Sequence, residues 1–387
     1  MTHTWDKIKN VATRFRDLTT IGVANVISSS ISGIFWLYIA ALLGTEHYGE
    51  VSYYIAVAGI ASAVSFLGAG NTIVVYTAKG EKIQSPIFFI SSISSIIVSI
   101  ILFFIFYNFG VSLYVIGYII FGLATSDILG RKLYKSYSKY LITQKILMVA
   151  FAISFYYLTG SQGVVLGIAL SFFPYFIRLY KGFKESKMEF STIKSHFGFM
   201  MNSYVLDLSR TFSGYTDKLI VAPMFGFAIL GNYQLGVQFL SLLSILPAIV
   251  YQYILPQDAS GNPNIKLKKT IVVVSVGLAI LGILLAPIIL PILFPKFMEA
   301  IGVIRIISLA VVPSTLNLVY ISKFLGEEKS RIVLIGSGIY LSVQIISIVI
   351  LGQFFGISGI AASIVLASSF EAIFLVSMNK LSIKKQM

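Results

Sequence analysis

Four charged side chains lie inside an otherwise apolar stretch of the chain, residues 205 to 218, which reads VLDLSRTFSGYTDK. On a helix, spacings of i, i+3, i+7 and i+10 put Asp207, Arg210, Gly214 and Asp217 on one face, with Lys218 next to the last of them. A charged side chain near the bilayer centre costs about 2.5 to 3.5 kcal/mol on insertion scales. This face cannot meet lipid, so the pattern predicts either paired charges or the wall of a hydrated cavity.

The composition places these charges in a polytopic membrane protein. Of the 387 residues, 57% are hydrophobic and 11% are charged, and the mean hydropathy is +0.89. The chain has no cysteine, and its three histidines (His3, His47 and His196) are too scattered to form a metal-ligand pattern. We therefore expect no metal, no redox chemistry, no thiol catalysis and no cofactor.

Apolar runs of about 20 residues are long enough for a helix to cross about 30 Å of hydrocarbon. The sequence predicts an all-α integral membrane fold with twelve transmembrane helices. The preceding residues, 1–19, are basic and polar and are expected to form a cytoplasmic interfacial helix, with nothing cleaved. The predicted spans are 20–43, 51–77, 85–107, 110–130, 141–159, 163–180, 198–222, 229–255, 270–294, 299–322, 332–354 and 356–379.

The basic residues predict the orientation of these spans. All but four of the 29 Lys and Arg residues fall on the side of the N-terminus, one (Lys296) falls on the opposite side, and Arg210, Lys218 and Arg305 lie within spans. In membrane proteins the cytoplasmic loops carry the excess of Lys and Arg. The protein is therefore predicted to lie in the plasma membrane with both termini on the cytoplasmic side. Because the basic residues decorate every inner loop instead of one patch, the net charge of +14 indicates contact with anionic lipids and not with nucleic acid.

The loops exclude several enzyme classes. None is long enough to form a domain, which argues against a membrane glycosyltransferase, polymerase or ligase. The chain also lacks a G-x-x-x-x-G-K-[ST] phosphate-binding loop, which argues against ATP hydrolysis. Transport driven by a gradient or by the substrate is the class that remains, and the protein is not expected to be an enzyme.

Glycine spacings indicate an internal duplication. A shift of 182 residues aligns the first and seventh predicted spans and the turns that follow them, and a shift of 196 aligns the sixth with the twelfth. Six spans precede six more, so the repeat is parallel, and we expect an N-terminal lobe at 20–190 and a C-terminal lobe at 191–387. The aligned pairs are Gly44 with Gly226, Gly49 with Gly231, Asn25 with Asp207, Ser28 with Arg210, Gly160 with Gly356 and Gly163 with Gly359.

Several segments resemble the polysaccharide and O-antigen flippases of the multidrug/oligosaccharidyl-lipid/polysaccharide (MOP) exporter superfamily. They are ALLGTEHYGEVSYYIAVAGIASAVSFLGAGNTIVVYTAKG, TDKLIVAPMFGFAILGNYQLGVQFLSLLSILPAIVYQYILPQ, VIRIISLAVVPSTLNLVYISKFLGEEK and FFGISGIAASIVLA. The resemblance covers almost the whole chain but contains no catalytic signature. It implies two six-helix lobes around a central cavity, which opens alternately to each face and moves a polyprenyl pyrophosphate-linked oligosaccharide outward.

The intramembrane charges are the candidate site, and each has more than one explanation. Asp207 and Arg210 could neutralise each other or could meet substrate, Asp217 and Lys218 could form a structural or gating pair, and Glu371 could couple protons or pair with a neighbour. Arg210 could hold a pyrophosphate through its planar guanidinium. The candidate substrate-binding residues are Arg210, Asp207, Asn25, Ser28 and Arg305, and the candidate gating or coupling residues are Asp217, Lys218 and Glu371.

The sequence is also compatible with two other functions. A multidrug exporter of the same superfamily would exchange organic cations for protons or sodium, but it would favour buried carboxylates without a nearby Arg. A scaffold for a glycan-assembly complex would need no buried charge. The Arg210 next to Asp207 favours an anionic substrate, a lipid-linked oligosaccharide, with a proton or sodium as the coupling ion.

The predicted orientation can be tested by introducing single cysteines into this cysteine-free chain. Cysteines replacing Ser330 and Asn264 should be shielded from an impermeant thiol reagent in intact cells, because both positions lie in basic loops. A cysteine replacing Thr45 should react. Labelling at either inner position in intact cells would contradict the twelve-span topology.

Overall fold

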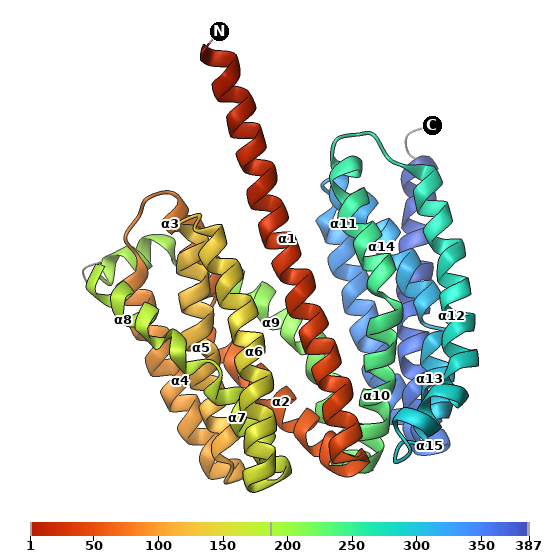
Figure 1. Ribbon diagram of the computed structural model, residues 1–387. Helices are drawn as coiled ribbons and strands as arrows, with labels where there is room; N and C mark the ends of the chain where they lie inside the picture. Colours follow the sequence, from red (N-terminus) through yellow and green to blue (C-terminus); the bar gives the residue numbers. More distant parts are fainter. Residues whose placement is uncertain (1, 186–187, 385–387) are drawn as a thin grey trace. The chain divides into compact units, whose positions relative to one another are not determined.

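The computed structural model describes residues 2–185 and 188–384, and its regular structure is helical throughout these ranges (Figure 1). The first part of the chain contains α1 (Thr2–Leu43), α2 (Thr45–Phe66), α3 (Ala69–Ala78), α4 (Gln84–Phe106), α5 (Phe109–Gly130), α6 (Tyr134–Thr159), α7 (Ser161–Leu170), the short 3-10 helix η1 (Phe173–Tyr175) and α8 (Phe176–Glu185). The second part contains α9 (Ser191–Phe225), α10 (Phe227–Leu243), α11 (Ile245–Ala259), α12 (Ile265–Leu293), α13 (Ala300–Ser308), α14 (Val311–Gly326) and α15 (Ser330–Lys384). The predicted all-α fold is confirmed.

The predicted spans have helical counterparts. Nine helical segments of the described chain are long and apolar enough to cross a membrane, and α10 with α11, bent by 47°, makes a tenth. Of the nine, the 52-residue segment in α15 is interrupted at Gly356, where φ is 57°, and so supplies two of the predicted spans. The remaining predicted span lies in α9, whose charges lower its hydropathy. Since α1 runs unbroken from Thr2 to Leu43, the interfacial placement of residues 1–19 stays a prediction.

Contacts divide the chain into two compact units. Unit 1 comprises residues 1–35 and 54–215, and unit 2 comprises residues 36–53 and 216–387. Helices α1, α2 and α9 each contribute residues to both units, so the chain crosses between the units inside helices instead of in loops. The predicted lobes, 20–190 and 191–387, remain a prediction.

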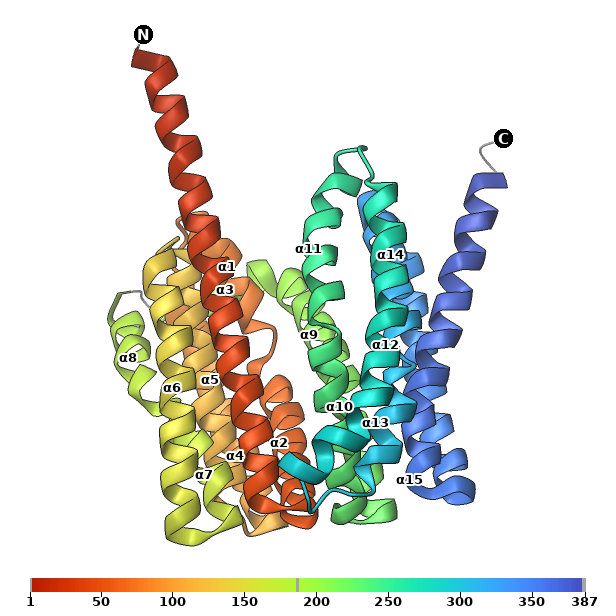
Figure 2. The ribbon, with the colours of Figure 1, turned by 45° about the vertical axis from the view of Figure 1, so that its right-hand side comes forward.

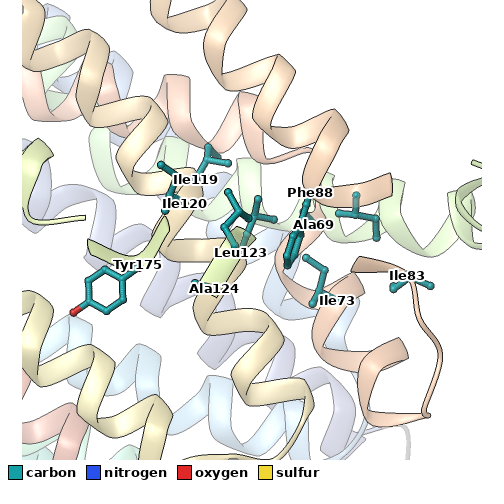
Figure 3. Close-up of a cluster of buried hydrophobic side chains, with 11 residues drawn as sticks. Ala69, Ile73, Ile83, Phe88, Ile119, Ile120, Leu123, Ala124 and Tyr175 are labelled. Carbon is teal, nitrogen blue, oxygen red and sulfur yellow. The ribbon is translucent and has the colours of Figure 1, made fainter. Parts of the chain in front are cut away.

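Unit 1 has its apolar core between α3, α4, α5 and α8. Figure 3 shows Ile73 of α3, Phe88 of α4 and Leu123 of α5 pointing toward one another, and all three are buried. At one end of this core lies the fully buried carboxylate of Asp127, which accepts hydrogen bonds from Arg131, at 2.8 Å, and from Arg178 of α8. Two guanidinium groups thus neutralise the one buried carboxylate, as burial of a charge requires.

Unit 2 is built around α10, α13 and α15. Its core contains Tyr233 of α10, Val303 of α13, Ile348 and Ile360 of α15, and Val221 from the end of α9, all at most 1% exposed. Helix α13 contacts α10, α12 and α15, and α14 contacts α11, α12 and α15. Figures 1 and 2 show α11, α12 and α14 side by side, with the α11–α12 loop at one end of the unit.

The predicted repeat is visible in the backbone. Gly44 and Gly226 both have positive φ, 78° and 91°, which glycine adopts without a steric penalty, and each precedes a helix. The hydrogen bonds around them match at the offset of 182: Gly44 N donates to Ala40 O as Gly226 N donates to Ala222 O. Similar backbone turns therefore begin α2 and α10.

The second offset is equally well reproduced. Gly160 precedes α7 with φ 77°, and Gly356 interrupts α15 with φ 57°. A Cβ atom on Gly163 would lie 2.1 Å from Phe155 O, and one on Gly359 would lie 2.0 Å from Leu351 O, a pair of contacts also related by 196 residues. The parallel repeat is thus confirmed at both predicted offsets.

The repeat-related glycines Gly49 of α2 and Gly231 of α10 lie in a close contact between these two helices inside unit 2. A Cβ on Gly49 would lie 1.9 Å from Phe227 O, and a Cβ on Gly231 would lie 1.9 Å from Thr45 O. Thr45 and Phe227 are themselves 182 residues apart, so the contact is reciprocal. The first turns of α2 and α10 cross at a local two-fold axis so closely that only glycine fits.

This close crossing predicts that adding one methyl group at Gly231 lowers the stability of the protein. Gly231→Ala should destabilise the protein by about 1 to 3 kcal/mol, because the added Cβ must displace backbone atoms of Thr45. The matched control is Gly277→Ala in α12, where a Cβ would meet nothing within 4 Å. Thermal unfolding in detergent measures both variants, and equal stability of Gly231→Ala and the wild type would contradict the close crossing.

Candidate functional site

Asp207 and Arg210 line one cavity of about 300 Å³ in unit 1. Since they are three residues apart on α9, they project from the same face of the helix, as the sequence predicts. The opposite walls come from α2, α3 and α5. The complete lining is Ala63, Phe66, Gly70, Asn71, Tyr118, Asp207, Arg210 and Thr211.

The two charges of this cavity do not form a close ion pair. Salt bridges within 4.0 Å in the described part of the chain do not include one between Asp207 and Arg210. Asp207 is half-buried and Arg210 is exposed, while Thr211 donates its hydroxyl to the backbone oxygen of Asp207 at 2.8 Å. The Arg210 guanidinium therefore keeps donors available to a ligand in the cavity.

The cavity also contains three side chains that the sequence analysis missed: Phe66, Asn71 and Tyr118. Asn71 and Tyr118 offer an amide and a phenol for hydrogen bonds, and Phe66 offers an apolar ring. Asn71 could have been predicted from the sequence, because a polar amide within a predicted span has a desolvation cost, as the charged side chains do. Phe66 and Tyr118 had none, since aromatic residues are common throughout the spans.

Three other predicted substrate-binding residues lie elsewhere. Asn25 is exposed on α1, and Ser28 is buried on the same helix, and neither is among the residues that line this cavity. Arg305 is exposed on α13, which belongs to unit 2. The structure therefore brings together Asp207 and Arg210, and it does not place Asn25, Ser28 or Arg305 among the residues of their cavity.

Asp217 and Lys218 belong to unit 2 and are both buried, at 6% and 8% exposure. The Lys218 Nζ lies 3.1 Å from Asp217 Oδ1, and the Tyr233 hydroxyl donates to Asp217 Oδ2 at 2.9 Å. The Asp217 carboxylate is thus neutralised by an adjacent ammonium and fixed by a phenol from α10. This geometry fits a structural or gating pair, one of the roles that the sequence leaves open.

Glu371 on α15 is buried in a different setting. Its Oε2 accepts a hydrogen bond from Asn317 Nδ2 of α14 at 2.8 Å, and the same amide nitrogen also donates to Ser368 O at 3.1 Å. No Lys, Arg or His within the described ranges forms a salt bridge with Glu371. It is therefore a buried carboxyl group held by an amide instead of a cation, a setting in which proton uptake needs no ion pair to be broken.

Metal-binding geometry is absent from the residues that the structure describes. No group of three or more His, Cys, Asp or Glu side chains in those ranges could hold a metal ion. The candidate residues described above offer the guanidinium groups of Arg210 and Arg305, the Lys218 ammonium, carboxyl groups, amides and phenols. Such a set can bind an anion and exchange protons.

Comparison with known proteins supports the fold. No protein-family model matches the chain, and no curated protein matches its sequence. It does resemble an inward-facing multidrug resistance MATE family transporter of the MOP superfamily, with a TM-score of 0.74 at 13% identity over 93% of this chain and 96% of that one. It resembles the lipid II flippase MurJ in an inward closed conformation equally well, with a TM-score of 0.74 at 14% identity over 93% of this chain and 87% of MurJ.

A third solved structure is a MOP superfamily transporter from Pyrococcus furiosus, for which reverse polarity of the binding pocket suggests a different function. It gives a TM-score of 0.60 at 13% identity over 95% of each chain. The chain therefore has the two-lobed helical fold of MOP transporters. These solved proteins are transporters and not enzymes, and at such identities their substrates are their own.

The different settings of Asp217 and Glu371 predict different costs of neutralisation. Asp217→Asn should lower the thermal stability in detergent by about 3 kcal/mol or more, because it removes the negative charge next to the buried Lys218 ammonium. Glu371→Gln should cost about 1 kcal/mol or less, since a glutamine oxygen can still accept from Asn317. Equal costs for the two variants would contradict this distinction between an ion-paired and an amide-bonded carboxyl group.

Proposed function

We propose that this protein is a transporter of the plasma membrane that moves a lipid-linked oligosaccharide, carried on a polyprenyl pyrophosphate, from the cytoplasmic to the outer leaflet. The substrate would serve the assembly of a cell-surface polysaccharide or glycan. The observation that carries the proposal is the Arg210 guanidinium, which lines a cavity without a close ion pair to Asp207. The similarity of the fold to both MurJ and MATE transporters supports transport as the class of activity.

The chemistry of the cavity suits a pyrophosphate with a sugar attached. A guanidinium presents several N–H donors in a planar fork, which matches the oxygens of a phosphate. Asn71 and Tyr118 can exchange hydrogen bonds with sugar hydroxyls, and Phe66 can cover an apolar sugar face. The prenyl tail would remain in the bilayer and would not have to enter the cavity. Asp207, half-buried in the same wall, is proposed to bind the sugar, because its carboxylate oxygens can accept hydrogen bonds from sugar hydroxyls.

Alternating access is proposed to arise from movement of the two lobes, with no bond made or broken. Within this scheme Asp217 and Lys218 act as a gating pair, because they are buried and fixed by Tyr233. Glu371 is the proposed coupling residue, since a buried carboxyl group without a cationic partner can take up and release a proton. Arg305, exposed on α13, is a further candidate for an anionic part of the substrate, and Asn25 and Ser28 are candidates for its polar part.

A cation-coupled multidrug exporter is the second candidate function. Glu371 favours it, because a buried carboxyl group could also exchange an organic cation for a proton. Arg210 argues against it, because a guanidinium in the cavity wall would repel a cationic drug. The two candidates therefore differ in the sign of charge that the cavity should accept.

The proposal predicts a specific ranking of Arg210 variants. Arg210→Ala should leave the protein inserted and folded but lower glycan export by roughly tenfold or more, because hydrogen bonds between charged groups contribute about 1.5 to 3 kcal/mol. Arg210→Lys should restore export in part, since it keeps the charge and loses the fork. Surface glycan is measured in cells that depend on the introduced copy. Ser213→Ala, an exposed position on the same helix outside the cavity lining, is the control and should export normally.

A double variant separates substrate binding from a purely structural pair. If Arg210 only balances Asp207, then Asp207→Ala should rescue Arg210→Ala completely. Substrate binding by Arg210 predicts that the double variant exports no better than Arg210→Ala. Full rescue would contradict the proposed role of Arg210.

A further inference from the structure

A second and larger cavity, of about 800 Å³, lies in unit 2 at the end of the unit where α11 passes into α12. Its walls come from the end of α11, the first two turns of α12 and the second half of α14, which lie side by side in Figures 1 and 2. Nothing in the proposed transport chemistry uses it. Its two ends differ sharply in polarity.

One end of this cavity is basic, and its carboxylates are already engaged. Asp258, with a side chain 4% exposed, receives both the Lys268 ammonium, at 2.6 Å from each carboxylate oxygen, and the Ser322 hydroxyl, at 2.5 Å. Glu327 lies 2.7 Å from Lys329 Nζ and 3.6 Å from Lys323 Nζ. These carboxylates therefore have little capacity left to neutralise another cation.

Positive charge remains after these pairs are formed. Lys269 lines the cavity and is exposed, and no hydrogen bond or ion pair to it exists within the part of the chain that the structure describes. Lys323 donates to the neutral Asn379 Oδ1 at 2.5 Å, so only the longer contact to Glu327 offsets its charge. An anion entering this end would meet two ammonium groups that are not fully compensated.

The other end of the cavity is apolar. Val272 and Val273 follow Lys268 and Lys269 by one helical turn on α12, and Leu316 and Val319 precede Lys323 on α14. Four residues along a helix correspond to a rise of about 6 Å. One ligand can therefore touch the lysines with its head and the valines with its tail. Val273 is 72% exposed, so this wall is open to a hydrocarbon chain approaching from the bilayer.

We propose that this cavity binds an anionic phospholipid, with its phosphate between Lys269 and Lys323 and an acyl chain along Val273 and Leu316. A basic pocket between transmembrane helices at the membrane surface is the expected form of such a site. A soluble anion would leave the apolar end unused, and a cation would be repelled by the lysines. The lipid would join α11, α12 and α14 at the end that the charge distribution of the sequence assigns to the cytoplasm.

The test is a titration of the delipidated full-length protein with phosphatidylglycerol or phosphatidylcholine, followed by native mass spectrometry. The wild type should retain phosphatidylglycerol in preference to phosphatidylcholine. Lys269→Gln combined with Lys323→Gln should weaken phosphatidylglycerol retention on the order of tenfold, and Lys269→Gln alone, at an exposed position that should not affect folding, by roughly fivefold. Leu316→Trp, which fills the apolar end, should lower retention with all lysines in place.

Matched controls make the outcome decisive. Lys266→Gln combined with Arg331→Gln removes the same charge from exposed positions outside the cavity lining and should leave retention unchanged. Equal loss in this control would show a general charge effect and overturn the site. Full displacement of the lipid by an equal concentration of glycerol phosphate would show a soluble-anion site and would also overturn the proposal. Arg210→Ala should bind phosphatidylglycerol normally, so the lipid site and the proposed transport function fail independently.

Discussion

The free-energy cost of placing a charge in an apolar environment determines how the buried charged side chains of this protein are paired. Three buried carboxylates meet that cost with cations from their own unit: Asp127 with Arg131 and Arg178, Asp217 with Lys218, and Asp258 with Lys268. In each of these groups the carboxylate is already paired and has little capacity left to bind a further cation. Charged groups without such a partner are the better candidates for ligand binding, because they can still form an ion pair or a hydrogen bond with a ligand.

Two such places bear on the proposed transport function, and they differ in their chemistry. The cavity of Asp207 and Arg210 offers an accessible guanidinium with polar and aromatic neighbours, which is suited to an anionic headgroup. Glu371 offers a buried carboxyl group on an amide, which is suited to a proton. They lie in different units, so the proposed binding of substrate and the proposed exchange of protons involve different parts of the chain.

The sequence predicted the fold well because its signals are local. Span length follows from apolar runs. The repeat follows from glycines with a positive φ, which other residues adopt less readily (Gly44 and Gly226), and from glycines in close contacts that leave no room for a Cβ (Gly49 and Gly231). The lining of the cavity around Asp207 and Arg210 was predicted only in part. Asp207 and Arg210 share a helical face and therefore share a cavity, whereas Phe66 and Tyr118 reach it from other helices by packing, which no spacing rule reports. Asn25 and Ser28, inferred from the repeat offset alone, do not line that cavity.

The central claim is that the cavity of Arg210 accepts an anionic lipid-linked sugar, and direct binding tests it best. Purified protein in nanodiscs would be titrated with a polyprenyl pyrophosphate-linked oligosaccharide and, separately, with ethidium. We expect saturable binding of the lipid-linked sugar that weakens with salt, since exposed charge contacts are screened over about 8 Å at physiological ionic strength. Arg210→Ala should abolish this binding. Binding of ethidium that protons displace, with no affinity for the lipid-linked sugar, would contradict the central claim.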